Sequence, residues 1–93
     1  GGLIENVPRM LPDGIAARFD TSSWPALPIF SLIQEDGGIH HDEMFRVFNM
    51  GLGMVLVCDP SEADRVLELT PDAMVVGEVV EAGAGGEAVV LRD

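Results

Sequence analysis

Residues 43–58 read EMFRVFNMGLGMVLVC, which predicts a helix, a glycine-containing loop and a buried strand in that order. Asp42 and Glu43 lie in the first turn of the helix, where negative charge suits the helix dipole. The apolar residues at 44, 45, 47 and 48 face inward. Residues 54–58 form an unbroken apolar run, so we interpret Cys58 as a small core hydrophobe and not as a nucleophile.

The chain that follows predicts a β-α-β-β order. Asp59 or Ser61 caps a helix that continues to Thr70. Two valine-rich runs, residues 74–81 and 88–91, flank a glycine-rich tip and form a hairpin. The connection from the strand at 54–58 through the helix is expected to be a right-handed crossover.

The first 42 residues predict two helices and one strand. Apolar residues recur near the helical period from residue 3, and this helix ends before Pro12. Pro8 either lies in its first turn or kinks it.

A strand at 15–20 precedes a helix that Ser22 or Ser23 caps, near Pro25, and that stops at the glycine pair 37–38. No linker or repeat divides these elements. The sequence therefore predicts one α+β domain, or part of one, with helices packed on a mixed sheet of about four strands.

Composition excludes several classes of function. Sixteen carboxylates face five basic residues, all of them arginine, and the net charge is −11. Without lysine, the chain has no phosphate-loop lysine and no Schiff-base lysine. An acidic surface repels a nucleic-acid backbone, so we expect no nucleic-acid partner. No run approaches the ~18 apolar residues of a membrane span, so we expect no membrane partner either.

Cysteine content and chain length bear on location and completeness. A single cysteine permits no intramolecular disulfide, which favours a reducing compartment. The 93 residues begin Gly1-Gly2-Leu3 without an initiator methionine, so we expect a piece of a longer protein. Apolar residues make up 47% of the chain, and part of that surface is expected to face a partner.

Two glycine-containing segments are candidate ligand sites. Gly1 and Gly2 precede a helix, so their amides either bind an anion such as phosphate or form an ordinary turn. Arg9 on the same helix either adds a contact to that anion or is solvated. Asn49 either caps the preceding helix or binds a substrate, and Gly51 and Gly53 permit close approach of a neighbouring element or a ligand.

Other catalytic and metal sites are not expected. The segment 49–53 lacks the third glycine of a dinucleotide-binding fingerprint and precedes a strand where that motif needs a helix. Neighbouring side chains at 40–43 do not converge on one point of a helix, so we expect no metal site. No serine lies in a strand-turn-helix elbow. The residues indicate a ligand-contacting module and not a self-sufficient catalyst.

Two motifs together resemble one family. Residues 1–12, GGLIENVPRMLP, and residues 43–54, EMFRVFNMGLGM, resemble the C-terminal domain of the AIR synthetase (phosphoribosylformylglycinamidine cyclo-ligase) family. SSW at 22–24 and PIF at 28–30 fall between them in the family's order. The resemblance runs to about Cys58 and continues more loosely to the end. Val47 stands where the family's threonine is expected, which puts a polar role at that position in doubt.

The resemblance implies an ATP-dependent ligase of de novo purine biosynthesis that converts formylglycinamidine ribonucleotide to aminoimidazole ribonucleotide. It implies a cytoplasmic homodimer whose ATP and Mg²⁺ are bound mainly by an N-terminal domain absent from this chain. Residues 1–93 are then part of the C-terminal domain, without a cofactor of their own, and form one wall of an interdomain substrate cleft. The residues expected to bind the phosphorylated substrate are Gly1, Gly2, Arg9, Arg46, Asn49 and Gly51, and no catalytic residue is assigned.

Alternatives to this interpretation belong to other classes. The chain is either such a fragment or a stand-alone, non-catalytic ligand-binding or assembly module with the same fold. A third interpretation is a related enzyme that acts on another phosphorylated metabolite. Similarly, Arg9 and Arg46 either contact the substrate or pair with carboxylates of the chain.

Overall fold

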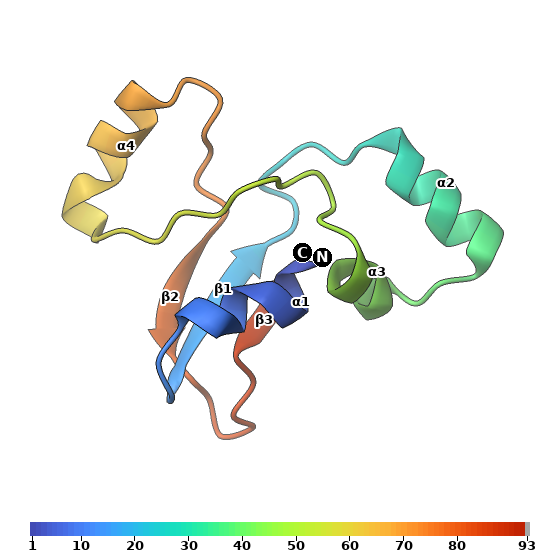
Figure 1. Ribbon diagram of the computed structural model, residues 1–93, viewed down its shortest axis with the longest axis horizontal. Coiled ribbons are helices and arrows are strands. Elements are labelled where there is room, and N and C mark those ends of the chain that lie inside the picture. The colour runs from blue at the N-terminus through green and yellow to red at the C-terminus, as the bar shows by residue number, and fades with distance from the viewer. Residues whose placement is uncertain (93) are drawn as a thin grey trace.

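A mixed sheet of three strands organises the computed structural model, which describes residues 1–92 (Figure 1). The central strand β1 (Ile15–Asp20) runs antiparallel to β2 (Gly77–Glu81) and parallel to β3 (Val89–Arg92). The predicted α+β class and the mixed sheet are confirmed, with three strands in place of about four.

The described residues form four α-helices, and two of them extend away from the sheet. Figure 1 shows α1 (Leu3–Asn6) lying across the sheet beside α3 (His41–Val47). α2 (Pro28–Gly37) extends away from the sheet beyond α3, and α4 (Ala63–Leu69) stands apart on the opposite side. α1 continues directly into a 3₁₀ helix (Val7–Met10), whose first turn contains Pro8 because proline needs no N–H partner there.

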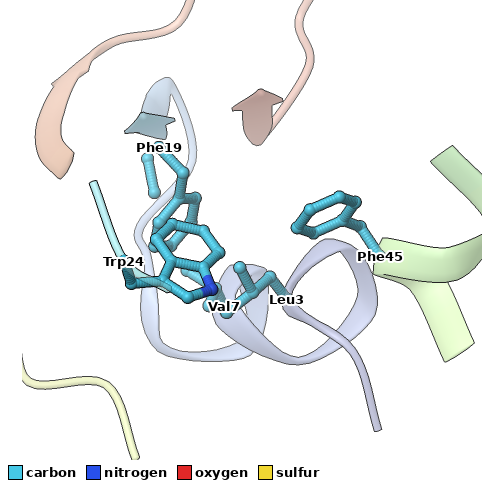
Figure 2. Close-up of a cluster of buried hydrophobic side chains, with 6 residues drawn as sticks. Leu3, Val7, Phe19, Trp24 and Phe45 are labelled. Atoms are coloured by element: carbon cyan, nitrogen blue, oxygen red, sulfur yellow. The ribbon is translucent and has the colours of Figure 1, made fainter. Parts of the chain in front are cut away.

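The core lies between α1, β1 and α3 (Figure 2). Trp24 meets the Phe45 ring edge to face, with ring centroids 6.3 Å apart and an interplanar angle of 78°. This geometry is favoured by the aromatic quadrupole. The buried cluster consists of Leu3, Val7, Ala17, Phe19, Trp24 and Phe45.

α3 follows its predicted boundaries, with one side chain facing differently. Asp42 and Glu43 lie in its first turn, and Met44 and Phe45 are buried as expected. Val47 is 47% exposed, so its predicted inward orientation is wrong. It lies two residues beyond Phe45, a separation that does not place side chains on one face of a helix.

The start of α2 differs from the prediction, whereas its end agrees. Ser22 and Ser23 do not cap it: the Ser22 amide and hydroxyl donate to Asp20 Oδ1, at 3.0 and 2.6 Å. These two hydrogen bonds, the side-chain one first, lower the pKa of Asp20. α2 begins only at Pro28, and it ends where Gly38 adopts a left-handed φ of 59°.

The predicted buried strand at 54–58 is not formed. These residues run as a coil outside the sheet and are exposed except for Val55, which is half-buried against the core, and Cys58 is exposed, so both predictions are wrong. An apolar run becomes a strand only through backbone hydrogen bonds with a neighbouring strand, and within the described part of the chain residues 54–58 make none with the outer edges of β2 or β3, which are free. The expected right-handed crossover is consequently absent from the described residues.

The two C-terminal strands also pair differently from the prediction. β2 and β3 run in opposite directions around the turn at 83–86, but β1 lies between them and each pairs with it. The central position lets Ala17 pair with both neighbours, opposite Val79 on one side and Val89 on the other. A 3₁₀ helix (Pro60–Glu62) leads directly into α4 and has the predicted cap, since Asp59 Oδ1 accepts a hydrogen bond from Ser61 N at 3.1 Å.

Phe45 is expected to be a main determinant of stability. It is 5% exposed and packs against Trp24, so Phe45→Ala removes buried apolar area and leaves a cavity. We expect the free energy of unfolding to fall by about 3–5 kcal/mol in a urea titration. Phe48→Ala, at a half-buried position one turn away, is the matched control and should cost less. Equal losses would contradict this assignment of the core.

Candidate functional site

A pocket of about 220 Å³ opens between the N-terminal helix and the loop after α3. Only two segments line it, 1–10 and 49–55, and each overlaps one of the two sequence motifs. Of the predicted site residues, Gly1, Gly2 and Asn49 line this pocket, whereas Arg9, Arg46 and Gly51 do not. The fold thus brings these two segments together although 38 residues, 11–48, separate them in sequence.

Several lining residues were not predicted. The remaining lining residues are Leu3, Asn6, Val7, Met10, Leu52, Gly53, Met54 and Val55. Helical spacing is the signal for some of them, since residues four apart share a helix face and Asn6 lies four residues after Gly2. No comparable signal exists for Met54 and Val55, because the prediction placed them in a buried strand.

Gly2 is fixed in place by its packing against α3. A Cβ atom on this residue would lie 2.0 Å from the Phe45 carbonyl oxygen and 2.5 Å from that of Arg46. Because backbone atoms cannot yield as a flexible side chain does, only glycine fits here. The Gly2 carbonyl accepts hydrogen bonds from Asn6 Nδ2 at 2.8 Å and from Asn6 N at 3.2 Å. The missing side chain therefore permits the close contact between α1 and α3, and residues of α1 form one side of the pocket.

The opposite side of the pocket is a tight turn stabilised by Asn49. Its Oδ1 accepts a hydrogen bond from Gly51 N at 2.8 Å, and its carbonyl accepts one from Leu52 N at 3.0 Å. Phe48 is the C-terminal cap of α3, so the alternative of Asn49 as that cap is wrong. Within residues 1–92, Asn49 Nδ2 has no hydrogen-bond partner, which leaves two N–H donors at the pocket.

Trp24 holds this turn in an unusual backbone conformation. Met50 has a φ of +52°, and Gly51 has a φ of +99°. A left-handed conformation is costly for methionine and is tolerated only where surrounding contacts impose it. The indole Nε1–H of Trp24 donates to the Met50 carbonyl at 3.0 Å, and this hydrogen bond supplies such a contact.

The two glycines of this loop have different roles. At Gly51 an added Cβ would make only ordinary contacts with Leu27, at 3.6 Å and beyond, so its requirement is the positive φ. At Gly53 nothing lies within 4 Å of such a Cβ, and its backbone φ is not in the left-handed region. Close approach of a neighbouring protein element therefore does not explain why glycine stands at either position. For Gly53, which lines the pocket, the other interpretation is the close approach of a ligand.

The two segments that form the pocket lie within a region that matches one protein family. The profile described as "AIR synthase related protein, C-terminal domain" matches residues 1–90. The chain belongs to this family.

Curated relatives carry a more specific name. The chain is 47% identical over 96 residues to a phosphoribosylformylglycinamidine cyclo-ligase from Bifidobacterium longum subsp. infantis, covering 99% of this chain and 28% of that protein. It is 51% identical over 89 residues to one from Geobacillus kaustophilus, covering 91% of this chain and 25% of that protein. It is 49% identical over 80 residues to one from Enterococcus faecalis, covering 86% of this chain and 23% of that protein. The chain thus spans about a quarter of the length of these relatives.

The two arginines predicted to bind the substrate differ in their contacts: Arg46 is paired with carboxylates of this AIR synthase-related domain, and within the described residues Arg9 is not. Arg46 Nε donates to Glu43 Oε2 at 2.8 Å, and Nη1 donates to Glu5 Oε1 at 3.0 Å. These hydrogen bonds, with Glu43 first, raise the pKa of Arg46, so its charge is partly neutralised by carboxylates on α3 and α1. Arg9 is exposed and makes no ion pair within the described part of the chain.

The histidine-rich segment makes local contacts only. His41 Nδ1 lies 3.3 Å from Asp42 Oδ1, and the imidazole packs on Phe45 with ring centroids 5.0 Å apart. Among residues 1–92, no three His, Cys, Asp or Glu side chains come together in a way that could hold a metal ion. No helix in this part of the chain is both long and apolar enough to cross a membrane.

Alanine substitutions at Gly51 and Gly53 should have different effects on the stability of this domain. Gly51→Ala places an L side chain at φ +99°, and we expect the free energy of unfolding to fall by about 1–3 kcal/mol. Gly53→Ala adds a methyl group in open space and should change stability by less than about 0.5 kcal/mol. Thermal or urea unfolding of both variants measures this contrast. A destabilisation at Gly53 as large as that at Gly51 would contradict the assigned roles.

Proposed function

We propose that this domain is the C-terminal part of an ATP-dependent cyclo-ligase that converts formylglycinamidine ribonucleotide to aminoimidazole ribonucleotide. The supporting observation is the family match over residues 1–90 together with relatives named phosphoribosylformylglycinamidine cyclo-ligase at 47–51% identity. That name describes a substrate with a phosphoribosyl group and a reaction that closes a ring. The stand-alone binding module is not favoured, because the match to these enzymes covers up to 99% of the chain.

The pocket is proposed to hold part of this substrate. Its volume of about 220 Å³ is below the ~300–1,000 Å³ typical of sites that enclose a complete small molecule. A nucleotide therefore extends beyond it, and the remainder of the cleft belongs to other parts of the enzyme. This supports a role for residues 1–93 as one wall of an interdomain site.

Individual binding roles follow from the donors available at and near the pocket. Asn49 Nδ2 is proposed to donate to the substrate, while its Oδ1 keeps the turn closed. The Gly1 and Gly2 backbone is proposed to approach the phosphate, with Gly51 shaping the loop that faces it. Arg9 and Arg46 are proposed to add positive electrostatic potential near the substrate phosphate, although Arg46 is already hydrogen-bonded to two carboxylates.

The residues described here do not fit an ATP or Mg²⁺ site. There is no lysine, and no acidic cluster able to hold a metal forms within residues 1–92. We propose that both are bound by an N-terminal domain of the same enzyme, and that the enzyme is a cytoplasmic homodimer. The contribution of this chain is then to bind and orient the substrate, with no proton-transfer pair of its own.

Asn49→Asp tests the substrate role directly in the complete enzyme. The aspartate keeps an oxygen for the Gly51 amide but removes the N–H donors and adds a negative charge beside the phosphate. We expect a melting temperature near that of the wild type and a loss of about 10- to 100-fold in kcat/KM.

Asn49→Ala is the comparison, because it removes both the donor and the turn-closing oxygen. This variant should lose stability as well as kcat/KM. Wild-type kcat/KM in a folded Asn49→Asp variant would show that Asn49 serves the turn alone.

A second prediction concerns the 93 residues by themselves. They contain no lysine and no metal-binding cluster within the described residues, so we expect no aminoimidazole ribonucleotide from substrate, ATP and Mg²⁺. The complete polypeptide assayed alongside is the positive control. Turnover by the 93-residue chain would overturn the two-domain description of the active site.

A further inference from the structure

The 220 Å³ pocket contains two polar side chains, Asn6 and Asn49, one from each of its two lining segments. The other residues that line it are glycines or have apolar side chains, and no charged side chain among residues 1–92 takes part. Recognition of a ligand inside the pocket therefore depends on two carboxamides and on backbone groups. Asn49 is proposed above as a donor to the substrate, whereas Asn6 has no role assigned so far.

The carboxamide of Asn6 has a fixed orientation. Its Nδ2 donates to the Gly2 carbonyl at 2.8 Å, and because a carbonyl only accepts, the amide nitrogen and not the oxygen must lie on that side. Within the described residues, Oδ1 of Asn6 has no hydrogen-bond partner. Asn6 thus brings an unused acceptor to the pocket, and Asn49 brings unused donors.

Gly1 leaves the space that the Asn6 carboxamide occupies. A Cβ atom on Gly1 would lie 2.2 Å from Asn6 Nδ2 and 3.1 Å from Asn6 Cγ. These atoms belong to the end of a flexible side chain, so an alanine at position 1 would drive the carboxamide into another rotamer without moving the backbone. The absence of a side chain at position 1 therefore keeps Asn6 in its observed orientation.

We propose that Asn6 is a specificity-determining residue of the substrate site, with Oδ1 accepting a hydrogen bond from a hydroxyl or N–H group of the substrate, and that Gly1 is its positioning residue. The inference rests on the proposed function, because it takes the substrate to be formylglycinamidine ribonucleotide. A phosphate dianion presents acceptors only, so Asn6 contacts another part of this molecule. A site with such an acceptor discriminates against analogues that lack the donor, because the acceptor is then left unpaired.

Asn6→Ser in the complete enzyme tests the acceptor separately from the donor. The serine hydroxyl can still donate to the carbonyl four residues earlier, but the carboxamide oxygen is lost. We expect a melting temperature near that of the wild type and a Kd for formylglycinamidine ribonucleotide about 10-fold higher in titration calorimetry. An unchanged Kd in the folded variant would overturn this inference alone. Failure of the wild-type enzyme to bind or convert the ribonucleotide would instead contradict the proposed function, and this inference with it.

Gly1→Ala tests the positioning role and does not alter the Asn6 residue itself. We expect a similar rise of about 10-fold in Kd, and no further rise when Asn6→Ser is added, because both substitutions remove the same hydrogen bond. Gly83→Ala is the matched control and should bind as the wild type does, since a Cβ atom there meets nothing within 4 Å and the residue lies outside the pocket. Multiplication of the two single effects to about 100-fold would show that the alanine obstructs the ligand directly, and would overturn the role of Gly1.

A substrate analogue without the ribose hydroxyl groups identifies the donor. Equal Kd values of wild type and Asn6→Ser for this analogue would assign the donor to a ribose hydroxyl. A difference that stays near 10-fold would assign it to an N–H group. A larger difference for the analogue than for the substrate would contradict a hydrogen bond to Asn6 from either source.

Discussion

The pocket depends on the close packing of Gly2 against the C-terminal end of α3. Two backbone carbonyls occupy the space of the missing side chain, at 2.0 and 2.5 Å from where a Cβ atom would be. This contact sets the distance between α1 and α3, and with it the position of the loop that leaves α3. Arg46 strengthens the same junction, because its guanidinium joins Glu43 of α3 to Glu5 of α1.

The loop after α3 combines a strained backbone with an available donor. Trp24 connects the two features, since it packs on Phe45 in the core and also donates to the Met50 carbonyl at 3.0 Å. The core thereby imposes the left-handed conformation that turns Asn49 toward the pocket. A site built in this way is preorganised, because its geometry is held by packing before a ligand binds. This is the property expected of a wall that orients a substrate for a reaction whose other groups lie elsewhere.

Local chemistry explains which elements could be predicted. The helix stop at Gly38, the cap at Asp59 and the strand at 15–20 each depend on residues within a few positions, and each is confirmed. The family resemblance is likewise carried by short motifs, and the match over residues 1–90 confirms it. Strand pairing could not be predicted in the same way. Residues 54–58 have the composition of a buried strand, yet the chain does not bring them against either free edge of the described sheet.

The sequence by itself determined the α+β class, the family and the two glycine-containing segments that supply part of the pocket lining, because these follow from periodicity, caps and motifs read along the chain. Only the tertiary structure decided that β1 separates β2 from β3, that Cys58 is exposed and that Gly2 must be a glycine. Each of these depends on contacts between residues far apart in the chain. Such contacts are set by which surfaces remain available once the core has formed, and no local pattern encodes that.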